Sequence, residues 1–149
     1  MANTYTQILY HIVFSTKERR PSIREDRQED LYRYVWGIHK NLKCHLYRIG
    51  GVADHVHILT SLHPTLPLAT YIERVKTGAT NWIRREQVFP RWPGWQDGYG
   101  AFTASWRDKD SIIEYIKSQP KHHRTVSFAD EFRELLTCAG VEFDERYLL

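Results

Sequence analysis

Two histidines flank a single valine in the segment His55-Val56-His57, which follows Asp54 and runs into apolar residues. Alternate side chains of a β-strand point to the same face, so both imidazoles would lie on one side of a strand here. Neutral imidazole is the most common metal ligand in proteins. The pattern therefore predicts a two-imidazole metal clamp that needs one or two further oxygen or nitrogen ligands.

Tyr115 and Gln119 supply a second chemical pair, four residues apart in a segment with helical periodicity. Residues at this spacing lie on one face of a helix, about one turn apart. A phenol is a suitable nucleophile toward phosphorus when a metal ion polarises the phosphate, and an amide oxygen can serve as a third ligand. Because a phosphotyrosine ester keeps much of the energy of the phosphodiester it replaces, such a site could both break and rejoin nucleic-acid strands.

The elements that must position these groups follow from the spacing of apolar residues. Strands are predicted over 7–15, 44–52, 55–62 and 99–105. Helices are predicted over 25–42 and 67–86, from 111 to the proline at 120, and from 127 to the glycine at 140. The first six elements, in the order β-α-β-β-α-β, predict an α+β, ferredoxin-like fold with a four-stranded antiparallel sheet and two helices on one face. One or two additional C-terminal helices carry the nucleophile.

The composition, with 149 residues of which 42% are hydrophobic and 26% charged, fits one globular domain over 1–149 and excludes disordered and collagen-like classes. No apolar run approaches the roughly 18 residues of a membrane helix, and the N-terminal residues lack a signal-peptide pattern. We therefore expect a soluble, cytoplasmic protein. Cys44 and Cys138 lack the spacing of a disulfide framework or zinc site, so both are expected to be reduced and buried.

The net charge of +3 permits a polyanionic partner without requiring one, so the placement of basic residues matters. They form three groups: Lys17, Arg19 and Arg20 in the first loop, Arg84 and Arg85 at a helix end, and Lys117, Lys121 and Arg124 beside the tyrosine. Each group alone is typical of a solvated surface. Together they predict an electrostatic track along the backbone of single-stranded nucleic acid.

Several aromatic and histidine side chains have two interpretations each. Trp92 and Trp95, in a segment rich in proline and glycine, would either stack on unpaired bases or pack as a hydrophobic lid or dimer contact. His122 and His123 would extend the metal site, contact DNA, or lie at a solvated helix end. His11 would either face the metal from the first strand or form a structural hydrogen bond.

The chemical residues fall in stretches that match a known family. His55-Val56-His57 and the run Tyr115-Ile116-Lys117-Ser118-Gln119, followed by His122-His123, are similar to the histidine signature and the nucleophile helix of HUH nucleases. The chain resembles in particular the single-tyrosine HUH transposases of the IS-two-hundred-like insertion sequences. The similarity extends to 9–17, 54–59 and 98–102, so it covers most of the chain.

This resemblance implies a division of labour. His55, His57 and Gln119 would bind a divalent ion, Mg²⁺ or Mn²⁺, and Tyr115 would attack a phosphate of single-stranded DNA. The attack would leave a 5′-phosphotyrosine and a free 3′-hydroxyl, and a second strand's 3′-hydroxyl would complete the transfer. The family further implies recognition of imperfect hairpins near element ends, and a homodimer in which the tyrosine helix can complete the partner's site. Pro120, directly after Gln119, leaves the regularity of that helix open.

Two other functions fit the same residues. A non-catalytic module could hold single-stranded nucleic acid on a ferredoxin-like sheet, as RNA-recognition domains do, although the sequence has no aromatic pair in the corresponding strand context. A domesticated relative would still cut hairpin DNA without moving its own gene, and the sequence does not separate it from a transposase.

Overall fold

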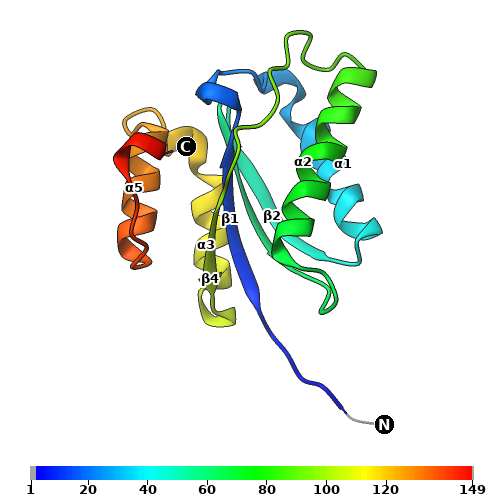
Figure 1. The fold of residues 1–149 in the computed structure, drawn as a ribbon, viewed down its shortest axis with the longest axis vertical. Coiled ribbons are helices and arrows are strands. Elements are labelled where there is room, and N and C mark those ends of the chain that lie inside the picture. The colour runs from blue at the N-terminus through cyan, green and yellow to red at the C-terminus, as the bar shows by residue number, and fades with distance from the viewer. Residues whose placement is uncertain (1–2, 149) are drawn as a thin grey trace.

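Four strands form one antiparallel sheet with the order β2-β3-β1-β4 (Figure 1). They are β1 (Leu9–Ser15), β2 (His45–Val52), β3 (His55–Ser61) and β4 (Gly100–Ala104). The computed structural model describes residues 3–148 and places β1 and β3 at the centre of the sheet. The strand order is that of a ferredoxin-like fold, so the predicted α+β class is confirmed.

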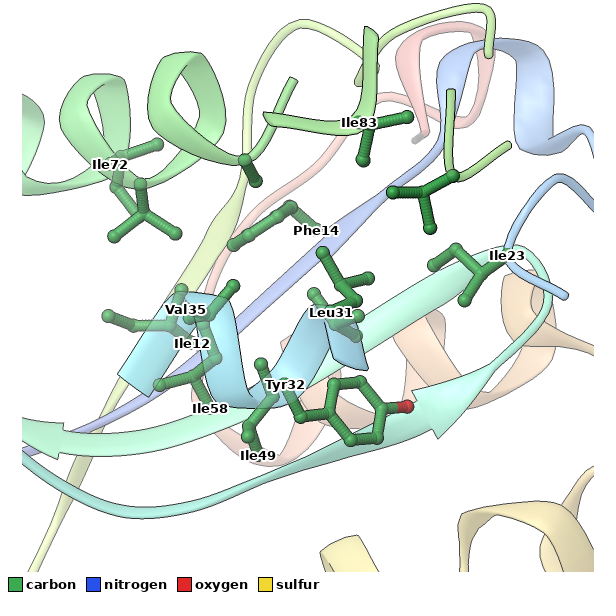
Figure 2. Packing of buried hydrophobic residues seen from close by; sticks show 14 of the residues in the cluster. Ile12, Phe14, Ile23, Leu31, Tyr32, Val35, Ile49, Ile58, Ile72 and Ile83 are labelled. Atoms are coloured by element: carbon green, nitrogen blue, oxygen red, sulfur yellow. The ribbon is translucent and has the colours of Figure 1, made fainter. Parts of the chain in front are cut away.

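Two long helices, α1 (Gln28–Asn41) and α2 (Leu68–Arg85), cover one face of the sheet (Figure 1). Their apolar stripes meet the even-numbered residues of the central strands, because alternate strand residues share a face. Figure 2 shows Ile12 and Phe14 of β1 and Ile58 of β3 packed against Leu31 and Ile72 of these helices. This layer forms the largest hydrophobic core cluster.

The opposite face carries three helices, α3 (Lys109–Lys117), α4 (Gln119–His122) and α5 (Phe128–Cys138). Ile116 of α3 packs on Leu9 and Leu59, and Phe128, Phe132 and Leu136 of α5 pack on Val13. Single turns of 3₁₀ helix occur at Lys17–Arg19, Glu25–Arg27, Trp106–Asp108 and Glu145–Tyr147. Both faces of the central strands are therefore covered, and none of the described helices is long and apolar enough to cross a membrane.

Two glycines allow the helices of this second layer to lie close to the sheet. A Cβ atom on Gly50 of β2 would lie 2.9 Å from Ile116 Cγ2, and one on Gly100 of β4 would lie 2.7 Å from Phe132 Cε1. β2 continues through Gly50 to Val52, where the strand predicted over 44–52 also ends. A larger residue at either glycine would push α3 or α5 off the sheet.

The expected helix that carries Tyr115 and Gln119 is divided in two. α3 ends at Lys117, and α4 begins at Gln119 after the non-helical Ser118. Pro120 lies in the first turn of α4, where its missing N–H leaves no hydrogen bond unmade, but it cannot continue the ladder of α3. Tyr115 and Gln119 are thus placed by two short helices and not by one face of a single helix.

The structure bears out half of the expectation for the cysteines and confirms the last predicted helix. Cys44 is buried, but Cys138 is exposed near the end of α5, and both thiols are free. The helix expected from 127 starts as predicted, because Ser127 Oγ accepts a hydrogen bond from the backbone N–H of Asp130, and it ends before Gly140, which has a φ of 71°.

The tryptophans of the segment between α2 and β4 belong to the hydrophobic core. Trp92 is buried, and its indole N–H donates to Thr80 Oγ1 at 3.1 Å. Trp95 packs edge-on against both Phe14 and Trp92. The lid interpretation therefore holds, and these indoles are not free to stack on unpaired bases.

Candidate active site

His55 and His57 lie at the start of β3 and point to the face covered by α3, α4 and α5. Both side chains have no exposed surface. The pairing with β1 places them opposite Ser15 and Val13. The alternation that predicted two imidazoles on one strand face is thus present in the structure.

A hydrogen-bond partner fixes the Nδ1 atom of each of these histidines. His55 Nδ1 lies 2.7 Å from Asp54 Oδ1, and His57 Nδ1 lies 2.9 Å from Nε2 of the buried His11. The rings are therefore oriented with their Nε2 atoms toward the interior of the site, the arrangement typical of metal-binding histidines. His11 contacts His57 from β1 and takes the structural role that was one of its two expected roles.

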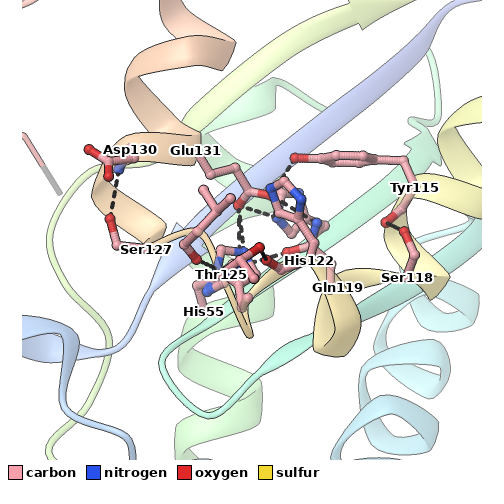
Figure 3. A network of polar contacts seen from close by, with 12 residues as sticks. His55, Tyr115, Ser118, Gln119, His122, Thr125, Ser127, Asp130 and Glu131 are labelled. Carbon is pink, nitrogen blue, oxygen red and sulfur yellow. Dashed lines mark hydrogen bonds and ion pairs between the residues drawn. The ribbon is translucent and has the colours of Figure 1, made fainter.

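The helices α3 and α4 bring the predicted tyrosine and amide to this pair. Gln119 is fully buried, and its Oε1 lies 2.9 Å from His55 Nε2. The ring of Tyr115 stands edge-on to that of His57, with 5.6 Å between ring centroids. All four predicted residues are therefore assembled within one chain. Figure 3 labels His55, Tyr115 and Gln119 of this set.

Glu131 of α5 lies at the centre of the assembly, and sequence reasoning missed it. Its side chain is 2% exposed. One carboxylate oxygen, Oε1, lies 3.0 Å from His57 Nε2. The other, Oε2, accepts hydrogen bonds from Gln119 Nε2 at 2.8 Å and from the Tyr115 hydroxyl (Figure 3). The one signal in the sequence was a carboxylate on the apolar stripe of a helix, directly before Phe132.

A third imidazole joins the cluster from the turn after α4. His123 Nδ1 contacts the carbonyl oxygen of Val126 at 2.7 Å, and its Nε2 lies 3.1 Å from Glu131 Oε1. One ligand atom from each of His55, His57, His123 and Glu131 lies within 4.8 Å of the others. This His-rich, Glu-containing cluster is suited to a divalent metal ion. His122 is more peripheral, with its Nε2 3.5 Å from Glu131 Oε2.

The surroundings of His55 and His57 shift their pKa values in opposite directions. Burial lowers the pKa of His57 to about 4, so its imidazole is neutral at pH 7. Burial also opposes a proton on His55, but its hydrogen bonds to Asp54, Glu131 and Gln119 raise its pKa to about 9. Without metal, the cluster therefore holds one proton on His55 opposite the buried carboxylate.

The carboxylate and the phenol have pKa values shifted in opposite directions. Hydrogen bonds from His123, His55 and His57 outweigh burial and hold the pKa of Glu131 well below its usual range. Burial and the facing Glu131 carboxylate raise the pKa of Tyr115 well above its usual range. In this arrangement Tyr115 keeps its proton and donates it in a hydrogen bond.

Most of the chain matches a known protein family. The family described as "Transposase IS200 like" matches residues 4–119. The chain belongs to this family. The protein is thus a transposase, a DNA-processing enzyme. The match ends at Gln119, so His123 and Glu131 lie beyond it.

Solved structures show the same fold as the transposase described here. A "putative transposase" from Deinococcus radiodurans R1 is 22% identical over 80% of this chain and 96% of its own, with a TM-score of 0.60. A REP-associated tyrosine transposase bound to a REP hairpin is 13% identical over 85% of this chain and 76% of its own, with a TM-score of 0.61. Comparison with curated proteins gives no match.

The basic residues predicted to track DNA lie in different parts of the transposase. Lys117, Lys121 and Arg124 are exposed on α3, α4 and the following turn. The loop with Lys17, Arg19 and Arg20 begins beside the histidines, because the N–H of Thr16 donates to the carbonyl oxygen of Asp54. Arg84 and Arg85 end α2, which packs on the other face of the sheet. The structure therefore does not bring Arg84 and Arg85 to the site.

Proposed function

We propose that the protein cleaves and rejoins single-stranded DNA at element ends through a 5′-phosphotyrosine intermediate, with Tyr115 as the nucleophile. The observation that carries the proposal is the Tyr115 hydroxyl, which contacts the same carboxylate, Glu131, as His57. A half-buried phenol held against a histidine and carboxylate cluster is positioned for attack on a phosphate.

In the proposed step, Tyr115 Oη forms a bond to phosphorus while the bond from phosphorus to the 3′ oxygen breaks. The proton of Tyr115 passes to Glu131 Oε2, which accepts its hydrogen bond, and from there to solvent. The electron pair of the broken bond goes to the 3′ oxygen, which takes up a proton from solvent. The number of phosphoester bonds is unchanged, so the reaction is reversible. A 3′-hydroxyl of a second strand would release Tyr115 and join the strands.

Three residues expected to hold a divalent ion, Mg²⁺ or Mn²⁺, fit that role by their donor atoms. His57 is neutral at pH 7, which leaves a lone pair for a cation, and His55 would give up one proton on binding. Gln119 offers an amide oxygen beside His55. When bound, the ion supplies Lewis-acid polarisation of the phosphate. Asp54 and His11 would hold the two rings in place.

The proposed substrate is DNA with an imperfect hairpin and an unpaired segment. The neighbour that was solved with a REP hairpin supports this substrate class. Six exposed basic residues lie on or beside the elements of the site and would contact the phosphate backbone: Lys17, Arg19, Arg20, Lys117, Lys121 and Arg124.

We further propose that Tyr115 acts on the site of its own chain, even if the protein forms the expected homodimer. The phenol, the strand histidines and Gln119 converge without a second chain. A dimer would then pair two complete sites on two DNA ends and would not be needed to build either of them.

The alternative of a non-catalytic binding module has less support. RNA-recognition domains stack bases on an open sheet face. Here β1 and β3 are buried on both faces, because α3, α4 and α5 cover the face that α1 and α2 leave free. A domesticated enzyme that cuts hairpin DNA would use the same residues.

The direct test incubates the protein with single-stranded oligonucleotides that carry the hairpins flanking its gene, together with Mg²⁺ or Mn²⁺. A covalent DNA adduct that survives denaturing electrophoresis is expected, and it should disappear with chelator or in Tyr115→Phe. The matched control is Tyr147→Phe, since Tyr147 is exposed and distant in sequence from the site. An undiminished adduct in the Tyr115→Phe protein would sink the assignment of the nucleophile.

A further inference from the structure

We propose that His123 and Glu131, from the segment beyond the family match, are metal ligands together with His55 and His57. We further propose that this set selects a first-row transition-metal ion such as Mn²⁺ over Mg²⁺. The inference deepens the proposed metal-dependent cleavage and rests on it. It assigns a ligand role to residues of the turn after α4 and of α5, which follow Gln119.

The three imidazoles converge on one atom. The Nε2 atoms of His55, His57 and His123 lie 3.4, 3.0 and 3.1 Å from Glu131 Oε1. The contacts of His57 and His123 are hydrogen bonds, and that of His55 is an ion-pair contact. Nitrogen and oxygen atoms that bind the same small ion are separated from one another by distances similar to these. A small movement of the carboxylate away from the rings would therefore make room for the ion.

Each of these rings has an independent partner on its other nitrogen. The Nδ1 atoms are held by Asp54 for His55, by His11 for His57 and by the Val126 carbonyl oxygen for His123. Such partners fix the ring orientation and raise the basicity of the ligating nitrogen. Three rings held in this way, all directed at one carboxylate oxygen, form a preorganised donor set and not a chance cluster of polar groups.

The burial of Glu131 argues for the same role. A carboxylate on the apolar side of α5 loses its hydration and needs positive charge nearby. The ring of Phe128 stacks on that of His55, with 4.3 Å between ring centroids, and the ring of Phe132 packs against Gly100. Apolar contacts therefore hold α5 over the histidines. A dication among three neutral imidazoles would supply the charge that Glu131 requires.

The donor types decide which ions fit. Mg²⁺ prefers an octahedral shell of oxygen ligands and keeps several waters, whereas imidazole nitrogen suits transition metals. Three imidazoles and one carboxylate therefore favour Mn²⁺ and its heavier neighbours over Mg²⁺. If His55, His57 and Gln119 alone formed the site, the set would hold fewer nitrogen ligands and would discriminate less.

The test measures metal binding by the full chain without DNA, so activity is not the readout. Isothermal titration calorimetry and the electron paramagnetic resonance signal of free Mn²⁺ would give Mn²⁺ affinity, and calorimetry would give Mg²⁺ affinity. We expect Mn²⁺ to bind at least about tenfold more tightly than Mg²⁺. Glu131→Gln and His123→Ala should each weaken Mn²⁺ binding by about tenfold or more and reduce the preference for Mn²⁺.

The matched controls are Glu134→Gln, on the exposed side of α5, and His45→Ala, on an exposed part of β2. Both should bind Mn²⁺ as the parent does. Unchanged or tighter Mn²⁺ binding by Glu131→Gln would overturn the inference, because the carboxylate would then only fill an empty site. If Glu131→Gln loses α5, as judged by circular dichroism, His123→Ala decides the matter, since His123 lies outside that helix. The proposed cleavage fails on a different result, the absence of a Tyr115-dependent adduct.

Discussion

The hydroxyl of Tyr115 and the carboxylate of Glu131 are joined by a hydrogen bond within one chain, although the two residues lie on different helices. The other oxygen of the same carboxylate faces the histidines of β3. The position of the proposed nucleophile and the geometry of the proposed metal cluster therefore depend on the same side chain.

Mixing two inactive variants tests whether Tyr115 serves its own chain. Tyr115→Phe lacks the proposed nucleophile, and His57→Ala lacks a proposed metal ligand. If each tyrosine serves the histidines of its own chain, a mixture of the two proteins should form no more adduct than either alone. Recovery of a substantial part of the parental adduct in the mixture would show action on a partner's site, provided that the chains exchange during incubation.

Gly100→Ala tests the docking of α5. The new methyl group would lie 2.7 Å from Phe132 Cε1, and overpacking of this kind costs about 1–3 kcal/mol of unfolding free energy. Because displacement of Phe132 also moves Glu131, Mn²⁺ affinity should fall with stability. Gly37→Ala, in α1 and with nothing within 4 Å, should instead stabilise the protein by about 0.5–1 kcal/mol without changing metal affinity. Urea unfolding and calorimetry measure both quantities.

The pH dependence of stability should show the burial of His39. Its Nδ1–H donates to the Val35 carbonyl oxygen at 2.8 Å, and its Nε2 accepts from the Tyr71 hydroxyl at 2.5 Å. Burial lowers the pKa of His39 below the 6.5 of an unfolded chain, so the unfolded state binds more protons in mild acid. This contribution is complete above pH 6.5 and is lost as the pH falls, with a slope of at most about 1.4 kcal/mol per pH unit.

Urea titrations between pH 7.5 and pH 5 would measure that slope in the parent and in His39→Gln. The variant should be less stable at neutral pH, because it loses the fit to Val35 and Tyr71, but its stability should fall less steeply in acid. Equal slopes in the two proteins would contradict the prediction. His11 and His57, whose pKa values burial lowers to about 3 and about 4, contribute in the same direction in both proteins.

Salt dependence of DNA binding separates the basic groups by their position. Replacing Lys121 with alanine should weaken binding to a hairpin oligonucleotide and reduce the slope of log affinity against log salt by about 0.7 for one lost phosphate contact. Arg84→Ala should leave both quantities unchanged, because α2 packs on the far face of the sheet. Fluorescence anisotropy at several salt concentrations is the measurement. Equal effects of the two substitutions would place the DNA across both faces.

The sequence predicted the sheet and the order of its elements because apolar periodicity is a local property. The alternation that placed His55 and His57 on one face needs only the strand itself. Their meeting with Tyr115 and Gln119 came from family resemblance and not from periodicity. The break at Ser118 shows the limit of helical spacing, because Pro120 changes the geometry that a four-residue spacing assumes.

Glu131 could not be predicted in the same way. A glutamate within a helix is usually solvated, and its burial depends on how α5 docks on β1 and β4, which no local pattern specifies. The wrong expectation for Cys138 has a related cause. Cys138 is the last residue of α5 and is exposed there, although its residue type is commonly buried.

The central strand β1 takes part in both layers of the molecule. Ile12 and Phe14 support α1 and α2, while His11 and Val13 lie under the histidine and glutamate cluster and α5. In this seven-residue strand, alternate residues therefore have different roles: one set packs in the hydrophobic core, and the other lies beneath the site. A one-residue slip of this strand would exchange the two sets, so no register other than the native one could yield a stable enzyme with an intact reaction centre.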